Sequence, residues 1–184
     1  MSKRDMSKSE VLRNKTILAV DDELDILDTL EDLLEDETEL ILHKATAYEQ
    51  ARQLLFSHNY DLVILDIMGV HGFDLLEIAF HRGFPVVMLT THALNPEALK
   101  QSIDGGAKAY LPKTYLSNIV PFLEDVLKLS EQSVWRKAIS EVFALFDDQF
   151  GSTWRKSEAD FWRDLENRLS LEEPVILSDR KQRK

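Results

Sequence analysis

The sequence predicts an α/β fold, a doubly wound five-stranded parallel sheet with an added C-terminal helical hairpin. Short runs of continuous apolar residues alternate with helical patterns five times up to about residue 129. Continuous apolar strands that alternate with helices are typical of a parallel sheet with both faces covered. Beyond residue 130, two aromatic-rich helical stripes meet at Gly151-Ser152, which predicts the hairpin.

Each strand and helix has its own local signal. The helix after the first strand has leucines at helical spacing, with acidic residues on its other face. An Asn95-Pro96 pair begins another helix, and Gly105-Gly106 ends it. The strands are expected over residues 16–20, 40–45, 61–66, 85–90 and 109–112. The helices are expected over residues 23–36, 47–57, 73–81 and 95–104, and from 116 through the end of the sheet domain toward 150.

Composition narrows the function classes. The chain of 184 residues has a net charge of −11, which argues against unspecific nucleic-acid binding. It has no cysteine, so disulfides and thiolate metal sites are excluded. No apolar run reaches the roughly 18 residues that span a bilayer, and the basic start lacks a secretory apolar region. We therefore expect a cytoplasmic protein without a membrane segment.

The charge is unevenly distributed, which suggests a boundary between domains. Residues 1–129 carry 12 Lys and Arg against 22 Asp and Glu, whereas residues 130–184 carry 10 against 11. We predict four parts along the chain: a flexible N-terminus over 1–15, a sheet domain over 16–129, a helical extension over 130–170 and a flexible tail over 171–184.

Polar residues follow four of the predicted strands. Asp21 and Asp22 follow the first strand, Asp66 ends the third, Thr90 ends the fourth and Lys113 follows the fifth. Ligands of open α/β sheets bind outside the carboxyl ends of the strands. We therefore expect three carboxylates, a hydroxyl and an ammonium to meet at one edge.

Each of these residues alone has an ordinary explanation: an aspartate could cap the following helix, and the lysine could lie in solvent. Together they suggest phosphoryl transfer. Neighbouring carboxylates repel each other unless a cation lies between them, and Mg²⁺ suits one to three carboxylates plus waters. A lysine and a hydroxyl can bind the remaining phosphoryl oxygens, and a carboxylate can act as the nucleophile.

Four motifs in order, "AVDDE", "DLVILDIM", "VVMLTTHA" and "GGAKAYLPK", resemble the receiver domain of bacterial two-component response regulators. The resemblance covers residues 16–129 and implies the strand order 2-1-3-4-5. It also implies a protein that is not an enzyme but a response regulator, phosphorylated with Mg²⁺ by a sensor histidine kinase or a phosphotransfer protein.

The resemblance assigns a role to each motif residue. Asp66 would be the phosphoacceptor, and Lys113 would pair with the phosphate. Thr90 would hydrogen-bond to the phosphate, and Tyr110 would be the switch aromatic that follows Thr90. The implied metal ligands are Asp21, which acts through water, Asp22, Asp66 and the Met68 carbonyl.

The segment "DIMGVHGFDLL" departs from the family pattern. It has no proline after Asp66, and Gly72 comes six residues after the acceptor, where the family has glycine eight residues on. The loop is thus two residues shorter, and we expect Gly69 and Gly72 to permit the tight path.

The extension leaves two interpretations open. Its three tryptophans, Trp135, Trp154 and Trp162, could pack on the chain's own sheet domain or form a surface for a homodimer or a protein partner through residues 130–170. No DNA-binding motif is recognised, so we expect output through protein–protein interaction. The alternatives are an unphosphorylated receiver-like scaffold and, less favoured because position 68 is Met where a second acid is needed, an aspartate-nucleophile phosphohydrolase.

Overall fold

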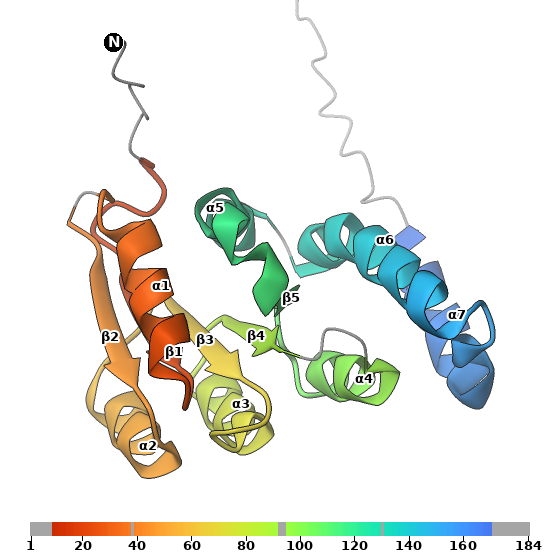
Figure 1. Cartoon of the computed structure of the whole chain (residues 1–184), viewed down its shortest axis with the longest axis horizontal. Helices are drawn as coiled ribbons and strands as arrows, with labels where there is room; N and C mark the ends of the chain where they lie inside the picture. Colours follow the sequence, from red (N-terminus) through yellow and green to blue (C-terminus); the bar gives the residue numbers. More distant parts are fainter. Residues whose placement is uncertain (1–8, 38, 92–94, 130, 171–184) are drawn as a thin grey trace, which may run out of the picture.

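The protein forms a five-stranded parallel sheet in the order β2-β1-β3-β4-β5 (Figure 1). The computed structural model describes residues 9–37, 39–91, 95–129 and 131–170. The predicted fold class and strand order are confirmed. The strands are β1 (Thr16–Val20), β2 (Ile41–Ala45), β3 (Leu62–Asp66), β4 (Val86–Thr90) and β5 (Ala109–Pro112).

Helices connect the strands and continue beyond the sheet. The connecting helices are α1 (Leu24–Leu34), α2 (Tyr48–Ser57), α3 (Gly72–His81) and α4 (Pro96–Asp104). A 3-10 turn, η1 (Lys113–Asn118), leads into α5 (Ile119–Lys128). The C-terminal extension consists of α6 (Glu131–Phe150), η2 (Trp154–Glu158) and α7 (Ala159–Ser170). None of the described helices combines the length and apolar character needed to cross a membrane.

The side-chain alternation of the strands divides the core into two halves. In β1, Leu18 and Val20 pack on the face that α2, α3 and α4 cover, whereas Ile17 and Ala19 pack on the face of α1 and α5. Every residue of β3 and β4 is buried. This two-sided burial explains why the strands have continuous apolar sequences, and it fixes their carboxyl ends at one edge.

The N-terminal segment is ordered earlier than predicted. Residues 1–8 lie outside the described residues, but Leu12 is fully buried in the core half beside α1 and α5. The Ser9 backbone N–H donates to Glu37 Oε2 at 2.8 Å. Residues 9–15, which the sequence analysis assigned to a flexible N-terminus, thus contribute one apolar side chain to the core before β1. The tail at 171–184 also lies outside the described residues.

The long helix predicted from 116 is interrupted. α5 ends at Lys128, and Leu129 adopts extended backbone (φ −90°, ψ 156°) before α6 begins at Glu131. The prediction of continuous helix is wrong here, although neither glycine nor proline marks the break. The break lets the first turn of α6 contact both core halves: Val134 packs with the α5 half and Trp135 with the α4 half.

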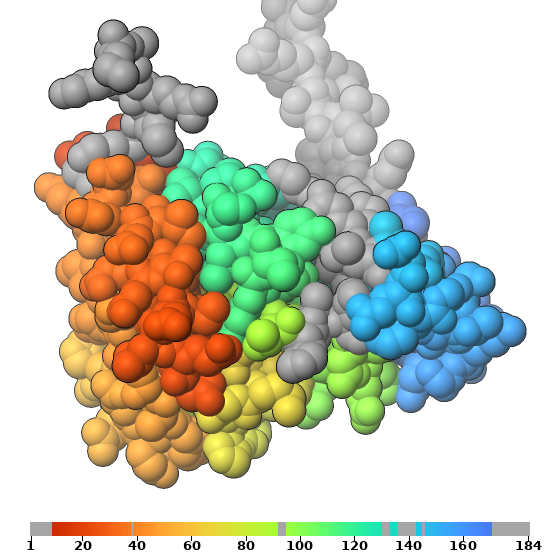
Figure 2. Space-filling model, in the orientation of Figure 1, coloured from red at the N-terminus to blue at the C-terminus, as the bar shows by residue number. Residues whose placement is uncertain are grey.

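The extension packs against β5, the edge strand of the sheet (Figure 1). It also contacts α4, beside which it lies in Figure 2. The indole N–H of Trp135 donates to the Ala107 carbonyl, just before β5, at 3.1 Å. All three tryptophans are buried, so the packing predicted for a structural extension is observed. A covered edge strand is also protected from pairing with other chains.

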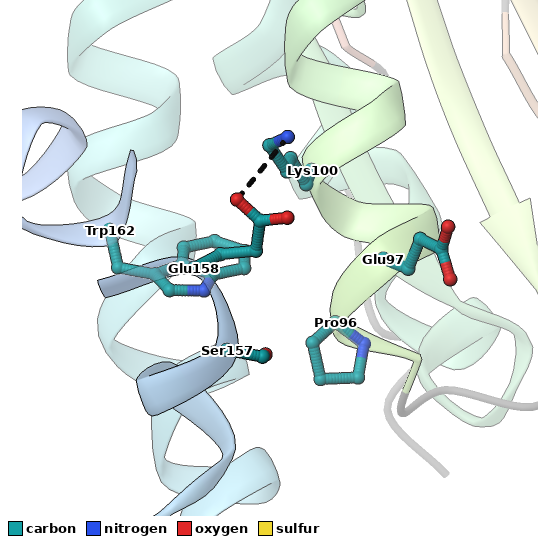
Figure 3. A pocket seen from close by; sticks show the side chains of 6 residues that line it. All are labelled: Pro96, Glu97, Lys100, Ser157, Glu158 and Trp162. Atoms are coloured by element: carbon teal, nitrogen blue, oxygen red, sulfur yellow. Dashed lines mark ion pairs between the residues drawn. The ribbon is translucent and has the colours of Figure 1, made fainter. Parts of the chain in front are cut away.

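A small pocket of about 270 Å³ lies between α4 and the extension (Figure 3). Lys100 of α4 reaches across it to Glu158 at 3.6 Å. The same ammonium lies 5.2 Å from the ring centre of Phe161. The extension is therefore joined to α4 by a charged contact at the rim as well as by buried aromatic side chains.

Candidate functional site

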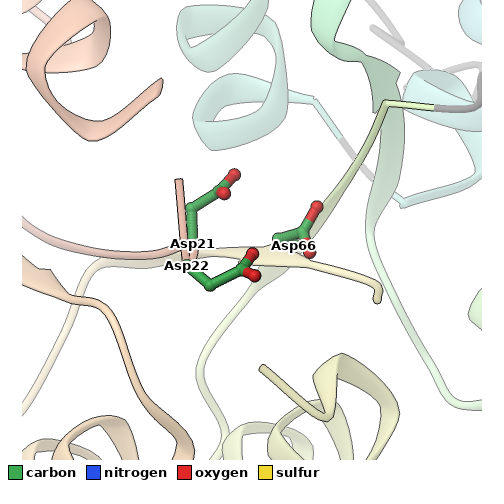
Figure 4. Close-up of side chains that lie close together, drawn as sticks. All are labelled: Asp21, Asp22 and Asp66. Carbon is green, nitrogen blue, oxygen red and sulfur yellow. The ribbon is translucent and has the colours of Figure 1, made fainter. Parts of the chain in front are cut away.

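The predicted polar residues lie at the carboxyl ends of four strands, along one edge of the sheet. Asp21 follows β1, Asp66 ends β3, Thr90 ends β4 and Lys113 follows β5, and all four are buried. Asp22 is exposed beside Asp21. Figure 4 shows Asp21, Asp22 and Asp66 on the neighbouring ends of β1 and β3. Parallel register brings these ends together, because each strand runs toward the same edge.

Lys113 lies at the centre of this site. Its Nζ is 2.7 Å from Asp21 Oδ2, 2.9 Å from Asp66 Oδ1 and 2.9 Å from Glu23 Oε1. Only 5% of the Lys113 side chain is exposed. The expectation of a solvated surface lysine is therefore excluded, because the ammonium neutralises carboxylates that the fold has removed from water.

Burial and neighbouring charges shift the pKa of Asp21 and that of Lys113. Burial raises the pKa of Asp21, while its contacts with Lys113 and the Glu23 backbone N–H partly oppose that rise. For Lys113, burial alone would lower the pKa, but the carboxylates of Asp21, Asp66 and Glu23 raise it above its ordinary value. The lysine is therefore a permanent cation at neutral pH.

The Asp66 carboxylate is held by backbone as well as by the lysine. Its Oδ2 accepts the backbone N–H of Met68 at 3.0 Å and that of Gly69 at 2.9 Å. These two donors and Lys113 fix the orientation of the carboxylate and leave part of its acceptor capacity free. The carboxylate is thus held in one orientation by three donors.

Three acidic residues could hold a metal ion. One ligand oxygen from each of Asp21, Asp22 and Asp66 lies within 4.8 Å of the others. Asp21 Oδ2 is buried and has no hydrogen bond of good geometry among the described residues, although Lys113 Nζ is close to it. Carboxylate oxygens are the ligands that hard divalent cations prefer, so the residues fit such an ion.

The short loop after Asp66 passes close to Asp22. A Cβ added to Gly69 would lie 1.9 Å from Asp22 Oδ1, and one added to Gly72 would lie 2.1 Å from the Asp66 carbonyl oxygen. The positive φ of this loop falls on His71 (54°). Gly72 is thus required for close approach to backbone, whereas a Cβ at position 69 would displace the Asp22 side chain.

Thr90 and Tyr110 lie on the neighbouring strands β4 and β5. Burial raises the pKa of Tyr110 to about 12, and the neighbouring Thr90 side chain opposes part of that rise. The Tyr110 hydroxyl has no hydrogen bond of good geometry within the described part of the chain. Tyr110 belongs to the same core half as Trp135, and its strand β5 contacts α6 of the extension.

The structure brings the side chains of Asp21, Asp22, Asp66 and Lys113 together, and Thr90 ends the neighbouring strand β4. The sequence analysis missed one residue of this group. Glu23, the third acid of "AVDDE", contacts Lys113, although it was assigned no role. Its proximity to Asp22 in the sequence was the available signal. The role of the Met68 carbonyl stays a prediction.

Comparison with known proteins agrees with this architecture. The family model described as the response regulator receiver domain matches residues 17–120. The chain is 29% identical over 157 residues to the transcriptional regulatory protein PdtaR of Mycobacterium tuberculosis, covering 76% of each chain.

Solved structures give the same assignment. The receiver domain of NtrX from Brucella abortus is 31% identical, with a TM-score of 0.54, 62% of this chain covered and 99% of that one. A two-component response regulator from Clostridium difficile is 25% identical, with a TM-score of 0.56, and the match covers 62% of this chain and 96% of that one.

Proposed function

Because this chain belongs to the family of response regulator receiver domains, we propose that it is a signalling switch in which Asp66 accepts a phosphoryl group. The donor would be a sensor histidine kinase or a phosphotransfer protein. The observation that carries the proposal is the buried Lys113 ammonium within 2.9 Å of the Asp66 carboxylate. An oriented carboxylate beside a fixed cation has the arrangement that phosphoryl transfer requires.

Each residue has a defined task in this proposal. An Asp66 oxygen forms the new bond to phosphorus while the donor's leaving group departs. Lys113 neutralises charge on the phosphoryl oxygens, and Thr90 donates a hydrogen bond to one of them. Asp22, Asp66 and the Met68 carbonyl would hold Mg²⁺ directly and Asp21 through water, and the ion would supply the remaining positive charge.

The spacing of the acidic residues supports Mg²⁺ as the cofactor. Ligand oxygens of three carboxylates lie within 4.8 Å of one another, and Gly69 leaves room for the Asp22 carboxylate. The alternative of an unphosphorylated scaffold predicts neither Mg²⁺ binding nor phosphoryl uptake. The receiver family consists of signalling domains, which agrees with the expectation that this chain is not an enzyme.

Output would pass through residues 130–170. The extension packs against β5 and α4, beside the Thr90–Tyr110 pair that phosphorylation would move. Since Trp135, Trp154 and Trp162 are buried within the chain, their release or rearrangement would be needed to offer them to a homodimer or a protein partner. A phosphoryl group adds roughly −1.5 to −2 charges, which can bias such a two-state contact.

A transcriptional role is a second candidate for the output. PdtaR is named a transcriptional regulatory protein, and its similarity covers 76% of this chain. We propose that any such role here is exerted through protein contact, because the net charge of −11 opposes binding to nucleic acid. Nucleic acid retained by the phosphorylated chain at physiological salt would favour direct binding instead.

Intact-mass measurement tests the proposal. We expect the parent chain, incubated with a small phosphodonor and Mg²⁺, to gain one phosphoryl group. Chelation of Mg²⁺ and the substitution Asp66→Asn should each prevent that gain. Undiminished labelling of Asp66→Asn would contradict the assignment of the acceptor. If the parent gained no phosphoryl group, the unphosphorylated scaffold would be the favoured interpretation.

A further inference from the structure

Glu23 contacts the central lysine, although neither the family resemblance nor the comparisons assign it a role. Its Oε1 accepts a hydrogen bond from Lys113 Nζ at 2.9 Å. About half of the Glu23 side chain is exposed, whereas Asp21 and Asp66 are almost fully buried. Glu23 is thus the solvent-facing partner of this ammonium.

The lysine is surrounded by carboxylates. Lys113 Nζ has three carboxylate oxygens within 2.9 Å, and its contact with Glu23 Oε1 is a hydrogen bond of good geometry, whereas Asp21 Oδ2 has none among the described residues. If Asp66 carries a phosphoryl group, a phosphoryl oxygen must compete with these carboxylates for the ammonium. Access to the lysine is therefore a competition among anions.

Glu23 is the partner that is displaced most readily. Asp21 and Asp66 lie at the ends of β1 and β3, and either would be left as a buried, uncompensated charge if the lysine moved away. The Glu23 carboxylate ends a longer side chain that water already reaches, so it regains hydration when it is released.

We infer that Glu23 is a positioning residue that holds the Lys113 ammonium and competes with the phosphoryl group for it. The inference rests on the proposed function, since it concerns how the phosphorylated state is reached. Glu23 thereby sets how readily the site binds a phosphoryl group, without touching that group itself.

The local structure makes this inference testable by substitution. The Glu23 backbone N–H, not its side chain, donates to Asp21 Oδ1, so that bond survives a side-chain change. Glu23 precedes α1 as its N-cap residue, but its side chain makes no cap hydrogen bond. A change at position 23 should therefore leave the helix and the fold intact.

The experiment is a titration of the full chain with beryllofluoride, a phosphoryl mimic, at saturating Mg²⁺. We expect Glu23→Gln to bind the mimic about two- to five-fold more tightly than the parent, the effect of losing one partly exposed ion pair. The melting temperature without the mimic should stay close to that of the parent.

Two further variants separate contact from charge. Asp25→Asn removes the same charge from the first turn of α1, where Asp25 is exposed and makes no ion pair in the described part of the chain. It should bind the mimic like the parent. Glu23→Asp keeps the charge but shortens the side chain, so it should also bind more tightly than the parent.

The outcomes distinguish the two proposals. The inference alone would be overturned if the parent binds beryllofluoride but Glu23→Gln has the same affinity for it as Asp25→Asn, or a lower one. If Glu23→Asp bound beryllofluoride with the affinity of the parent, the negative charge at position 23 and not its contact with Lys113 would explain the effect. That result would also overturn the inference. A parent that binds no beryllofluoride at saturating Mg²⁺ would overturn the proposed function together with the inference.

Discussion

At the residue scale, the charge balance of the site depends on one cation. Lys113 is the partner of the two buried carboxylates, Asp21 and Asp66, and it draws Glu23 inward from the surface. Buried ion pairs add little net stability when they are complete, but the loss of one partner is costly. The lysine therefore has both a structural and a functional role, and the two can be separated experimentally.

We expect Lys113→Ala to lower the free energy of unfolding without Mg²⁺ by about 3–5 kcal/mol, because two buried carboxylates lose their counterion. Saturating Mg²⁺ should restore part of this loss, while binding of beryllofluoride stays weaker than in the parent. Chemical denaturation with and without Mg²⁺ measures the first effect, and titration measures the second.

Lys44→Ala is the matched control, because Lys44 also pairs with two carboxylates, Asp28 and Glu31, but at the surface. Lys44→Ala should lower the free energy of unfolding much less than Lys113→Ala does, and it should leave the affinity for beryllofluoride unchanged. If Lys113→Ala were as stable as Lys44→Ala and bound the mimic normally, the central role of Lys113 would be contradicted.

At the scale of the elements, the loop between β3 and α3 determines whether the acidic residues can meet. It places Gly69 against the Asp22 carboxylate and supplies two backbone donors to Asp66. The loop therefore shapes the cation site, although most of its side chains take no part in it.

We expect Gly69→Ala to weaken Mg²⁺ binding about ten-fold, as displacement of a supporting group commonly does. The new Cβ would collide with a flexible, exposed side chain, so the melting temperature without Mg²⁺ should change little. Titration and melting with and without Mg²⁺ provide the measurement.

Gly83→Ala should lower the stability of the protein but leave its affinity for Mg²⁺ unchanged, the opposite of the result expected for Gly69→Ala. Gly83 has a φ of 76° and open space around its Cβ position, so the variant is strained and loses stability equally with and without Mg²⁺. Normal Mg²⁺ affinity in Gly69→Ala would show that Asp22 is not a ligand.

The contact between the extension and the sheet offers a second matched pair. Trp135 and Trp162 are equally buried, but only Trp135 has an indole hydrogen bond among the described residues, to the Ala107 carbonyl. We expect Trp135→Phe to be about 1–2 kcal/mol less stable than Trp162→Phe, because it leaves a buried carbonyl unpaired. Denaturation curves measure the difference, and equal losses would contradict the assigned docking bond.

The sequence predicted the elements more reliably than their junctions. Apolar runs identified all five strands, most clearly β3 and β4, which are buried on both faces, and more weakly the half-buried β2. The order of the motifs identified the candidate site. The break at Leu129 could not be predicted, because the apolar pattern continues across it and the packing of Trp135 decides it. Glu23 was missed because its partner is 90 residues away.

At the scale of the whole molecule, the extension packs on the edge strand of the sheet, so this edge forms a contact within the chain. It covers β5 and joins α4 through Lys100 and Glu158 (Figure 3). Both elements adjoin the Thr90–Tyr110 pair, so a shift of that pair on phosphorylation would act on the contact. By reciprocity, the state of the extension would also alter the affinity for the phosphoryl group.

We expect sedimentation to show the full chain as larger than a monomer in at least one phosphorylation state, or to show a protein partner bound in only one state. Burial of released aromatic side chains contributes on the order of 1.5–3 kcal/mol each, so a few would suffice for micromolar association. A chain ending at residue 129 should lack the effect. Monomers in both states, with no protein bound to residues 130–184, would leave the extension a structural element only.

The central claim, that Asp66 is the Mg²⁺-dependent phosphoacceptor, is tested most directly by locating the phosphoryl group. Borohydride reduces an aspartyl phosphate to homoserine, so peptide mapping of the reduced protein identifies the acceptor. After incubation with a small phosphodonor and Mg²⁺, we expect homoserine at position 66 and at no other aspartate, and none when Mg²⁺ is chelated. Homoserine at Asp21 or Asp22, or its absence from position 66 in a protein shown to be phosphorylated, would contradict the account.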